Sequence, residues 1–307
     1  TYGWQYGYFP GLVWDDAMEL SEGYWISRLV ELGIILHWLF SSKSNIQVRG
    51  NFKERLTKQY TTRQFWLNVG ISAVFGGIIF SQLFDNALEI YLKREVSIGY
   101  VRLHYSYNTF SDDELLLTKY NVKRFAKEIN DQYGLLNSSR IDVYVFQNSD
   151  DLYEYVGTRE ASVSKPWKRS IYITKQNLNS LKHEMVHVML SDKGRSPFDI
   201  SWTTGLTEGA AVAAEDDYDG IRDCDEYAAR ILQMKLSGGV KNVMSFSGFA
   251  SEASGKSYTL AGSFCKFMLE NYGAKKFLAC YHSGDFDDLY GDNALDSLEK
   301  EWIASLA

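Results

Sequence analysis

Two stretches near the start of the chain are almost wholly apolar. Residues 65–84 carry no charged side chain. A helix that rises 1.5 Å per residue needs about this many residues to cross the hydrocarbon core of a membrane. Residues 24–41 are also apolar, but Arg28, Glu31 and His37 interrupt them, and ionisable groups at membrane depth are costly unless paired. We expect 65–84 to span a membrane, the alternative being a buried helix, and 24–41 to span it or to lie in its interface.

Charges around these stretches are distributed unevenly. The residues before 24 include four acidic side chains and no Lys or Arg, whereas residues 42–64 include six Lys or Arg and one Glu. Lys and Arg accumulate in short loops on the cytoplasmic side of a membrane. Two spans would therefore put everything after residue 84 on the non-cytoplasmic side. The alternative for the basic segment is a solvated surface.

After about residue 97 the pattern becomes that of an α+β domain. Alternating or β-branched runs predict strands at 98–107, 141–146 and 170–174. Ser111 with Glu114 three residues later has the pattern of a capping box that opens a helix through Ile129, and residues 149–156 suit a short helix. We therefore expect an N-terminal membrane region over 1–96 and a second domain over 97–307.

The sequence NSLKHEMVHVMLS at 179–191 predicts a helix with metal-binding chemistry. His183 and His187 are four residues apart, so both imidazoles project from one helical face and can bind the same cation. Glu184 lies beside them, where it can take a proton from metal-bound water. Two imidazoles, one carboxylate and an open position suit Zn²⁺. The alternative is a helix whose two histidines touch no metal, although the chain has only 5 histidines.

A third zinc ligand is expected downstream. Glu208 follows His187 by 208 − 187 = 21 residues, room for a turn and a returning helix, and it opens an alanine-rich helical stretch. Glu226 is a rival third ligand. Glu215, two turns after Glu208, is a candidate to orient a ligating histidine through its other ring nitrogen, or else an exposed surface glutamate.

The combination of motifs resembles the peptidase-MA-like gluzincins. In that family HExxH is followed by a W-x-x-E-G-x-A helix that carries the glutamate ligand; here five residues rather than two separate Trp202 from Glu208. Further similar motifs are YTLAGSF at 258–264 and NYGAKKF at 271–277, and the resemblance covers roughly 110–305.

The resemblance implies a zincin-like metallopeptidase domain, with a mixed sheet, an active-site helix and a helical C-terminal part. It implies zinc ligands His183, His187 and Glu208, with Glu184 as general base. Tyr258 is implied as the donor that steadies the oxyanion of the tetrahedral intermediate, and Tyr281 and His282 are its rivals.

Composition narrows the function further. The net charge of −7 argues against nucleic acid as a partner, and the three cysteines (Cys224, Cys265 and Cys280) have no CxxC spacing that would form a metal knuckle. We expect a membrane-anchored, zinc-dependent endopeptidase that cleaves peptides or extended protein segments and meets lipid through its N-terminal helices. The alternative is a catalytically idle zincin-fold subunit of a membrane protein complex.

Overall fold

The structure is a computed structural model of the whole chain, and it describes residues 88, 91–136, 139–158, 160–195, 199–215, 224–235, 239–251 and 254–306. The predicted spans 24–41 and 65–84 lie outside these residues. Within the described part, none of the helices combines the length and apolar character needed to cross a membrane. Contacts divide the described residues into two units: those within 94–149 and 160–306 belong to the first, and residues 88, 91–93 and 150–158 belong to the second.

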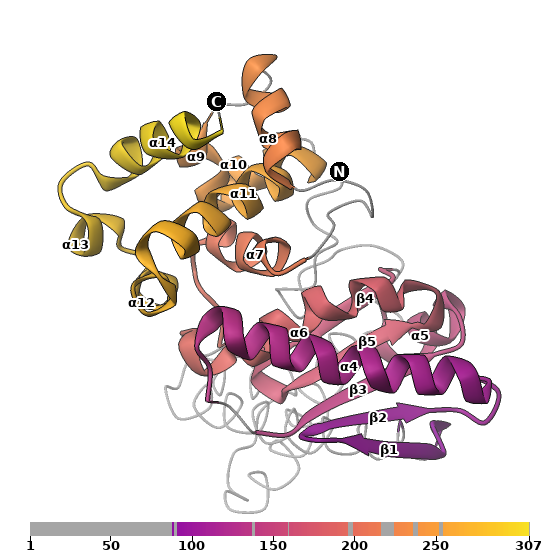
Figure 1. Cartoon of the computed structure of the whole chain (residues 1–307). Helices are drawn as coiled ribbons and strands as arrows, with labels where there is room; N and C mark the ends of the chain where they lie inside the picture. Colours follow the sequence, from indigo (N-terminus) through magenta and orange to yellow (C-terminus); the bar gives the residue numbers. More distant parts are fainter. Residues whose placement is uncertain are drawn as a thin grey trace, which may run out of the picture. The chain divides into compact units, whose positions relative to one another are not determined.

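A five-stranded mixed sheet lies in the first unit, with the strands in the order β1-β2-β3-β5-β4 (Figure 1). Its strands are β1 (Arg94–Ile98), β2 (Val101–Tyr105), β3 (Ile141–Phe146), β4 (Ser162–Lys165) and β5 (Ser170–Thr174). Strands β2, β3 and β5 run parallel, whereas β1 and β4 pair antiparallel at the two edges. The prediction of strands at 141–146 and 170–174 is confirmed.

The strand predicted at 98–107 is confirmed only over 101–105, as β2, and its first residue, Ile98, ends β1. The chain turns at Gly99 and Tyr100 and forms the β1–β2 hairpin instead. Gly99 has φ +62°, a backbone conformation that glycine adopts at little cost because it has no Cβ. A turn that depends on one glycine within a run of strand-forming residues leaves little trace in the hydrophobic pattern.

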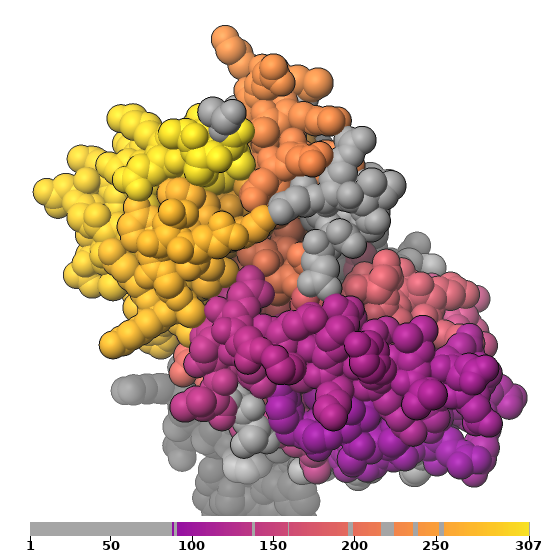
Figure 2. Space-filling model, viewed as in Figure 1, coloured from indigo at the N-terminus to yellow at the C-terminus, as the bar shows by residue number. Residues whose placement is uncertain are grey.

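One face of the sheet is covered by two helices, α4 (Asp112–Tyr133) and α6 (Leu181–Met189). Alternate residues of the three parallel strands share a buried cluster with side chains of these helices: Val101, Leu103, Val143, Val145, Ile171 and Ile173. The predicted capping box opens α4, because Ser111 and Glu114 each accept a hydrogen bond from the other's backbone N–H. Helix α4 lies along the surface of the molecule (Figure 2).

The described residues after α6 are mostly helical. They are α7 (Thr204–Ala213), α8 (Cys224–Gln233), α9 (Val240–Met244), α10 (Phe246–Ser251), α11 (Ser254–Tyr272), α12 (Ala274–Ser283), α13 (Phe286–Tyr290) and α14 (Ala294–Ser305). Short 3-10 turns lie at Pro166–Lys168, Lys175–Ser180 and Ser191–Lys193. Helix α11 is central to this group, because α7, α8, α9 and α12 all pack on it. In the second unit, Tyr91 stacks on Tyr155 of α5 (Ser149–Val156), with ring centroids 4.1 Å apart.

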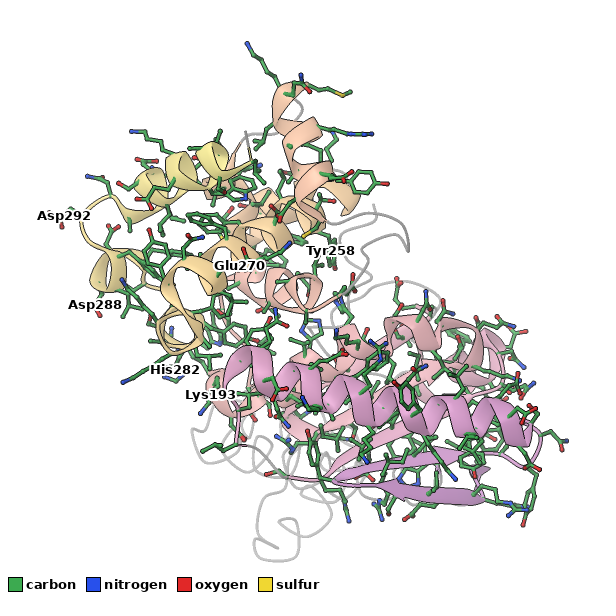
Figure 3. The ribbon with its side chains drawn as sticks, viewed as in Figure 1. Lys193, Tyr258, Glu270, His282, Asp288 and Asp292 are labelled. Atoms are coloured by element: carbon green, nitrogen blue, oxygen red, sulfur yellow. The ribbon has the colours of Figure 1, made fainter. Side chains whose placement is uncertain are left out.

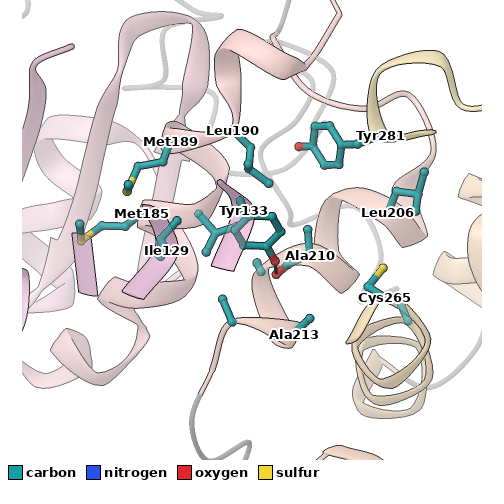
Figure 4. Close-up of a cluster of buried hydrophobic side chains, with 14 of the residues drawn as sticks. Ile129, Tyr133, Met185, Met189, Leu190, Leu206, Ala210, Ala213, Cys265 and Tyr281 are labelled. Atoms are coloured by element: carbon teal, nitrogen blue, oxygen red, sulfur yellow. Dashed lines mark hydrogen bonds between the residues drawn. The ribbon is translucent and has the colours of Figure 1, made fainter. Parts of the chain in front are cut away.

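Helix α7 is held tightly on both sides. A Cβ built on Gly209 would lie 2.5 Å from the carbonyl oxygen of Ala261 in α11, so the close approach of the two helices requires glycine there. On the other side, the Tyr133 hydroxyl of α4 donates a hydrogen bond of 2.6 Å to the carbonyl oxygen of Ala210 (Figure 4). The position of α7 therefore depends on contacts with both the sheet-covering helix and the C-terminal helices.

Candidate metal centre

Helix α6 presents two imidazoles on one face. Its other face is apolar and wholly buried, with Met185, Val186 and Met189 in the main core, so packing fixes the rotation of the helix. His183 and His187 are then adjacent, with ring centroids 4.9 Å apart. Both rings are shielded from solvent, since their side chains are 15% and 2% exposed.

Glu208 of α7 faces this pair. Its Oε2 atom lies 3.5 Å from His183 Nε2 and 3.7 Å from His187 Nε2. One ligand atom from each of the three residues lies within 4.8 Å of the other two. Within the described part of the chain, no other set of three or more His, Cys, Asp or Glu side chains converges in this way. Glu208 lies in the second turn of α7 rather than at its start, because the helix begins at Thr204.

These separations suit a zinc ion. Zinc in proteins is tetrahedral, with bonds of about 2.0–2.2 Å to imidazole nitrogen and carboxylate oxygen, which puts neighbouring ligand atoms about 3.4 Å apart. The two nitrogen-to-oxygen distances of 3.5 and 3.7 Å are close to that value. Three protein ligands also leave one coordination position open, as in catalytic rather than structural zinc sites.

Glu215 controls which nitrogen of His183 faces the cluster. Its Oε1 lies 3.0 Å from His183 Nδ1, so Nδ1 carries a proton that it donates to the carboxylate, and Nε2 is directed toward Glu208. Burial lowers the pKa of His183, but the hydrogen bonds to Glu208 and Glu215 outweigh burial and raise that pKa to about 10. His187 differs, because burial keeps its pKa below the ordinary value.

Glu184 has a partner that the sequence did not reveal. The residue is buried, at 9% exposure, and its Oε1 accepts a hydrogen bond of 2.8 Å from the Ser162 hydroxyl of β4. Strand β4 was not predicted from the sequence, since SVSK has little strand character, and a lone serine belongs to no motif. Only the pairing of β4 with β5 could have revealed this contact.

The three candidates for the oxyanion donor differ in their surroundings. The Tyr258 ring of α11 has its centroid 6.3 Å from that of His183 and packs edge-on against Phe249. Tyr281 is fully buried, and burial raises the pKa of its hydroxyl far above the ordinary value. His282 is exposed, and its Nδ1 lies 3.2 and 3.1 Å from the carbonyl oxygens of residues 193 and 194 (Figure 3).

Glu226 does not join the three convergent residues. It lies on α8 and lines a separate groove of about 520 Å³ with Arg230 and Glu270. His104, a lone histidine in the sequence, is hydrogen-bonded through Nε2 to Asp142 at 2.9 Å.

Comparison with known proteins gives a distant structural similarity. No family model matches the chain, and no curated protein matches it. Two structures of an M1 zinc metallopeptidase from Deinococcus radiodurans, one of them a point mutant, are similar with TM-scores of 0.40 and 0.39 at 13% and 16% sequence identity. The matches cover 68% and 69% of this chain, which spans about half the length of each neighbour (50% and 48%). At this level of similarity, the case for function rests on the residues of the site.

Proposed function

We propose that this chain is a zinc-dependent peptidase, with His183, His187 and Glu208 as ligands and Glu184 as general base. The observation that carries the proposal is the convergence of three ligand atoms from α6 and α7, within 4.8 Å of one another, beside the buried carboxylate of Glu184. Zinc bound there supplies Lewis acidity, which lowers the pKa of a water molecule and polarises a peptide carbonyl.

The protein's own groups divide the remaining work. Glu184 takes a proton from the attacking water and then delivers it to the nitrogen of the leaving amine, so that the carboxylate is regenerated. Tyr258 is our candidate to donate a hydrogen bond to the developing oxyanion, supported by its proximity to His183. We expect the substrate to be an extended peptide segment lying along β4, an edge strand of the sheet.

The idle-subunit alternative is less well supported by the same residues. A purely structural zinc site is usually closed by four protein ligands and needs no base. Here three ligands converge, and the neighbouring glutamate is itself hydrogen-bonded by Ser162. Both features suit a site that performs chemistry.

Metal content and hydrolysis test the proposal together. We expect the purified full chain to contain about one zinc ion and to cleave members of a quenched fluorescent peptide library, with activity lost in 1,10-phenanthroline. Glu184→Gln should keep the zinc and lose about 10²–10⁴-fold in rate, whereas His183→Ala should lose the zinc. Glu270→Gln, at an exposed glutamate in the separate groove that Glu226 lines, is the control and should keep both.

Two results would contradict the proposal in different ways. If the purified protein contains no zinc and His183→Ala changes neither metal content nor activity, the proposed metal site is refuted. Zinc-containing protein in which the wild type and Glu184→Gln are equally inert would instead favour the idle subunit of a membrane complex.

Membrane anchoring is a separate part of the proposal. It is supported by the uncharged stretch 65–84 and by the basic segment before it, and it would put the catalytic domain on the non-cytoplasmic side. Carbonate extraction of membranes should leave the full chain in the pellet and release a variant that lacks both candidate membrane segments, residues 24–84. If both proteins are extracted alike, the proposed membrane anchor is refuted and the peptidase proposal is unaffected.

A further inference from the structure

The hydrogen bond between Ser162 and Glu184 joins an edge strand to the proposed base. Ser162 is the first residue of β4, opposite Ile173 of β5. Its hydroxyl donates to Glu184 Oε1 over 2.8 Å, since an ionised carboxylate can only accept. A hydrogen bond to a charged acceptor is stronger than one between neutral groups, so this contact can hold the carboxylate in one orientation.

Such a restraint matters because three carboxylates surround two imidazoles here. Glu208 converges with the histidines, and Glu215 is held by His183 Nδ1 at 3.0 Å. Glu184 is the third, directly after His183 in the chain. Carboxylate oxygen is an ordinary zinc ligand, so an unrestrained Glu184 has an alternative to its role as a base: it can fill the one open coordination position.

We propose that Ser162 is a positioning residue that holds Glu184 to β4 and keeps its carboxylate out of the open coordination position. With Oε1 engaged by the serine, the second oxygen remains available to accept a proton. This inference rests on the proposed zinc site, but it concerns the coordination of the ion as well as the rate of hydrolysis.

The strand supplies a matched control. Ser164 lies two residues along β4, so its side chain is on the same face of the strand as that of Ser162. Its hydroxyl does not bond to Glu184, and its burial, at 7% exposure, makes its truncation at least as demanding for the fold. Ser162→Ala and Ser164→Ala therefore remove the same atom from neighbouring places.

Cobalt substitution of the full chain reads the coordination directly. The visible absorption of bound Co²⁺ depends on its ligand set, and azide changes that absorption where a position is open. We expect the wild type and Ser164→Ala to respond to azide. Ser162→Ala should have an altered spectrum and lose the azide response, because Glu184 occupies the open position.

Hydrolysis gives the second measurement. With one fluorogenic peptide chosen from the library, Ser162→Ala should lose about 10–100-fold in kcat, with KM and zinc content unchanged. Ser162→Thr, which keeps the hydroxyl, should restore kcat to within about threefold. Ser162→Cys, of similar volume but a weak donor, replaces the alanine variant if that variant fails to fold, with the same expected changes.

The outcomes separate this inference from the proposed function. A Ser162→Ala spectrum, azide response and kcat equal to those of Ser164→Ala overturn the role of Ser162, as does a folded threonine variant that behaves like alanine. Wild-type protein that binds Co²⁺ but cleaves no peptide overturns the peptidase alone, and the spectra still decide the role of Ser162. Wild-type protein that binds no Co²⁺ overturns both.

Discussion

The contact between α7 and α11 makes Gly209→Ala a sharp test of how the site is held. Gly209 directly follows the proposed ligand Glu208, and a Cβ added to it would lie 2.5 Å from the Ala261 carbonyl oxygen and 2.6 Å from Cys265 Sγ. Ordinary contacts between carbon and oxygen are about 3.3–3.6 Å. The carbonyl belongs to the backbone of α11, so it cannot move aside as a side-chain tip can.

The magnitude follows from two opposing effects. Adding a methyl group to a packed interior costs about 1–3 kcal/mol, and the short backbone contact puts this case at the upper end. Alanine is a better helix former than glycine by about 1 kcal/mol, which offsets part of the cost. We expect the free energy of unfolding of Gly209→Ala to fall by about 1–2 kcal/mol, or about 2–8 °C in Tm at roughly 2–4 °C per kcal/mol.

Glycine-to-alanine substitution in the partner helix provides the control. Gly255 lies near the start of α11, and a Cβ there would meet nothing within 4 Å. Gly255→Ala should therefore raise stability by up to about 1 kcal/mol through helix propensity. Differential scanning calorimetry of the wild type and both variants, with a zinc titration of each, makes the comparison.

Zinc affinity should follow the packing. When α7 shifts from α11, Glu208 shifts from the two histidines, and we expect zinc affinity to fall by about tenfold, near the lower limit for disturbed metal sites. Gly255→Ala should leave the affinity unchanged. If Gly209→Ala melts at or above the wild-type temperature, as Gly255→Ala should, the close helix contact does not position α7 and the reasoning fails.

Three further predictions follow from single contacts. Tyr133→Phe leaves a buried carbonyl of α7 without its donor, so urea unfolding should show a loss of about 1–3 kcal/mol, whereas the same change at exposed Tyr120 should cost nothing measurable. Glu215→Gln weakens the hydrogen bond to His183 Nδ1 and should lower zinc affinity about 10–100-fold in a chelator competition; unchanged affinity would refute the orienting role. Burial would raise the pKa of Asp142, but hydrogen bonds from a histidine and an arginine of β2 hold that pKa at about 2. The ionised carboxylate therefore adds to the free energy of unfolding above about pH 4, and this contribution is lost between about pH 4 and 2. Over that range the wild type should lose roughly 2 kcal/mol more than Asp142→Asn, and parallel acid-unfolding curves would contradict this.

The features that the sequence predicted well are local. The capping box at Ser111 and Glu114 and the strands at 141–146 and 170–174 depend on neighbouring residues, and the structure has them. The spacing of His183 and His187 on a helix follows from the helical repeat alone. The projection of both imidazoles from one helical face therefore depends on no tertiary contact.

Tertiary packing determines what the sequence missed. The motif around Glu208 favoured it over Glu226 as the third ligand only by resemblance, and the packing of α7 on α6 and α11 supplies the physical reason: it puts Glu208 near the histidines, whereas Glu226 lines another groove. Strand β4 is recognisable through its pairing with β5, not through its own four residues. Its contact with Glu184 was therefore invisible in the sequence.

The site depends on keeping three chemically equivalent side chains in three different roles. Burial and charge alone cannot distinguish Glu184, Glu208 and Glu215, because all three carboxylates interact electrostatically with the same pair of histidines. What differs is the restraint on each: glycine-mediated helix packing beside Glu208, an imidazole nitrogen for Glu215 and a strand hydroxyl for Glu184. These restraints come from α11, α6 and β4, so each can be removed without the others. Loss of the helix packing beside Glu208 should therefore lower both stability and zinc affinity, and loss of the Glu215 contact should lower zinc affinity alone. Loss of the Ser162 hydroxyl should change the coordination of the ion and the rate of turnover.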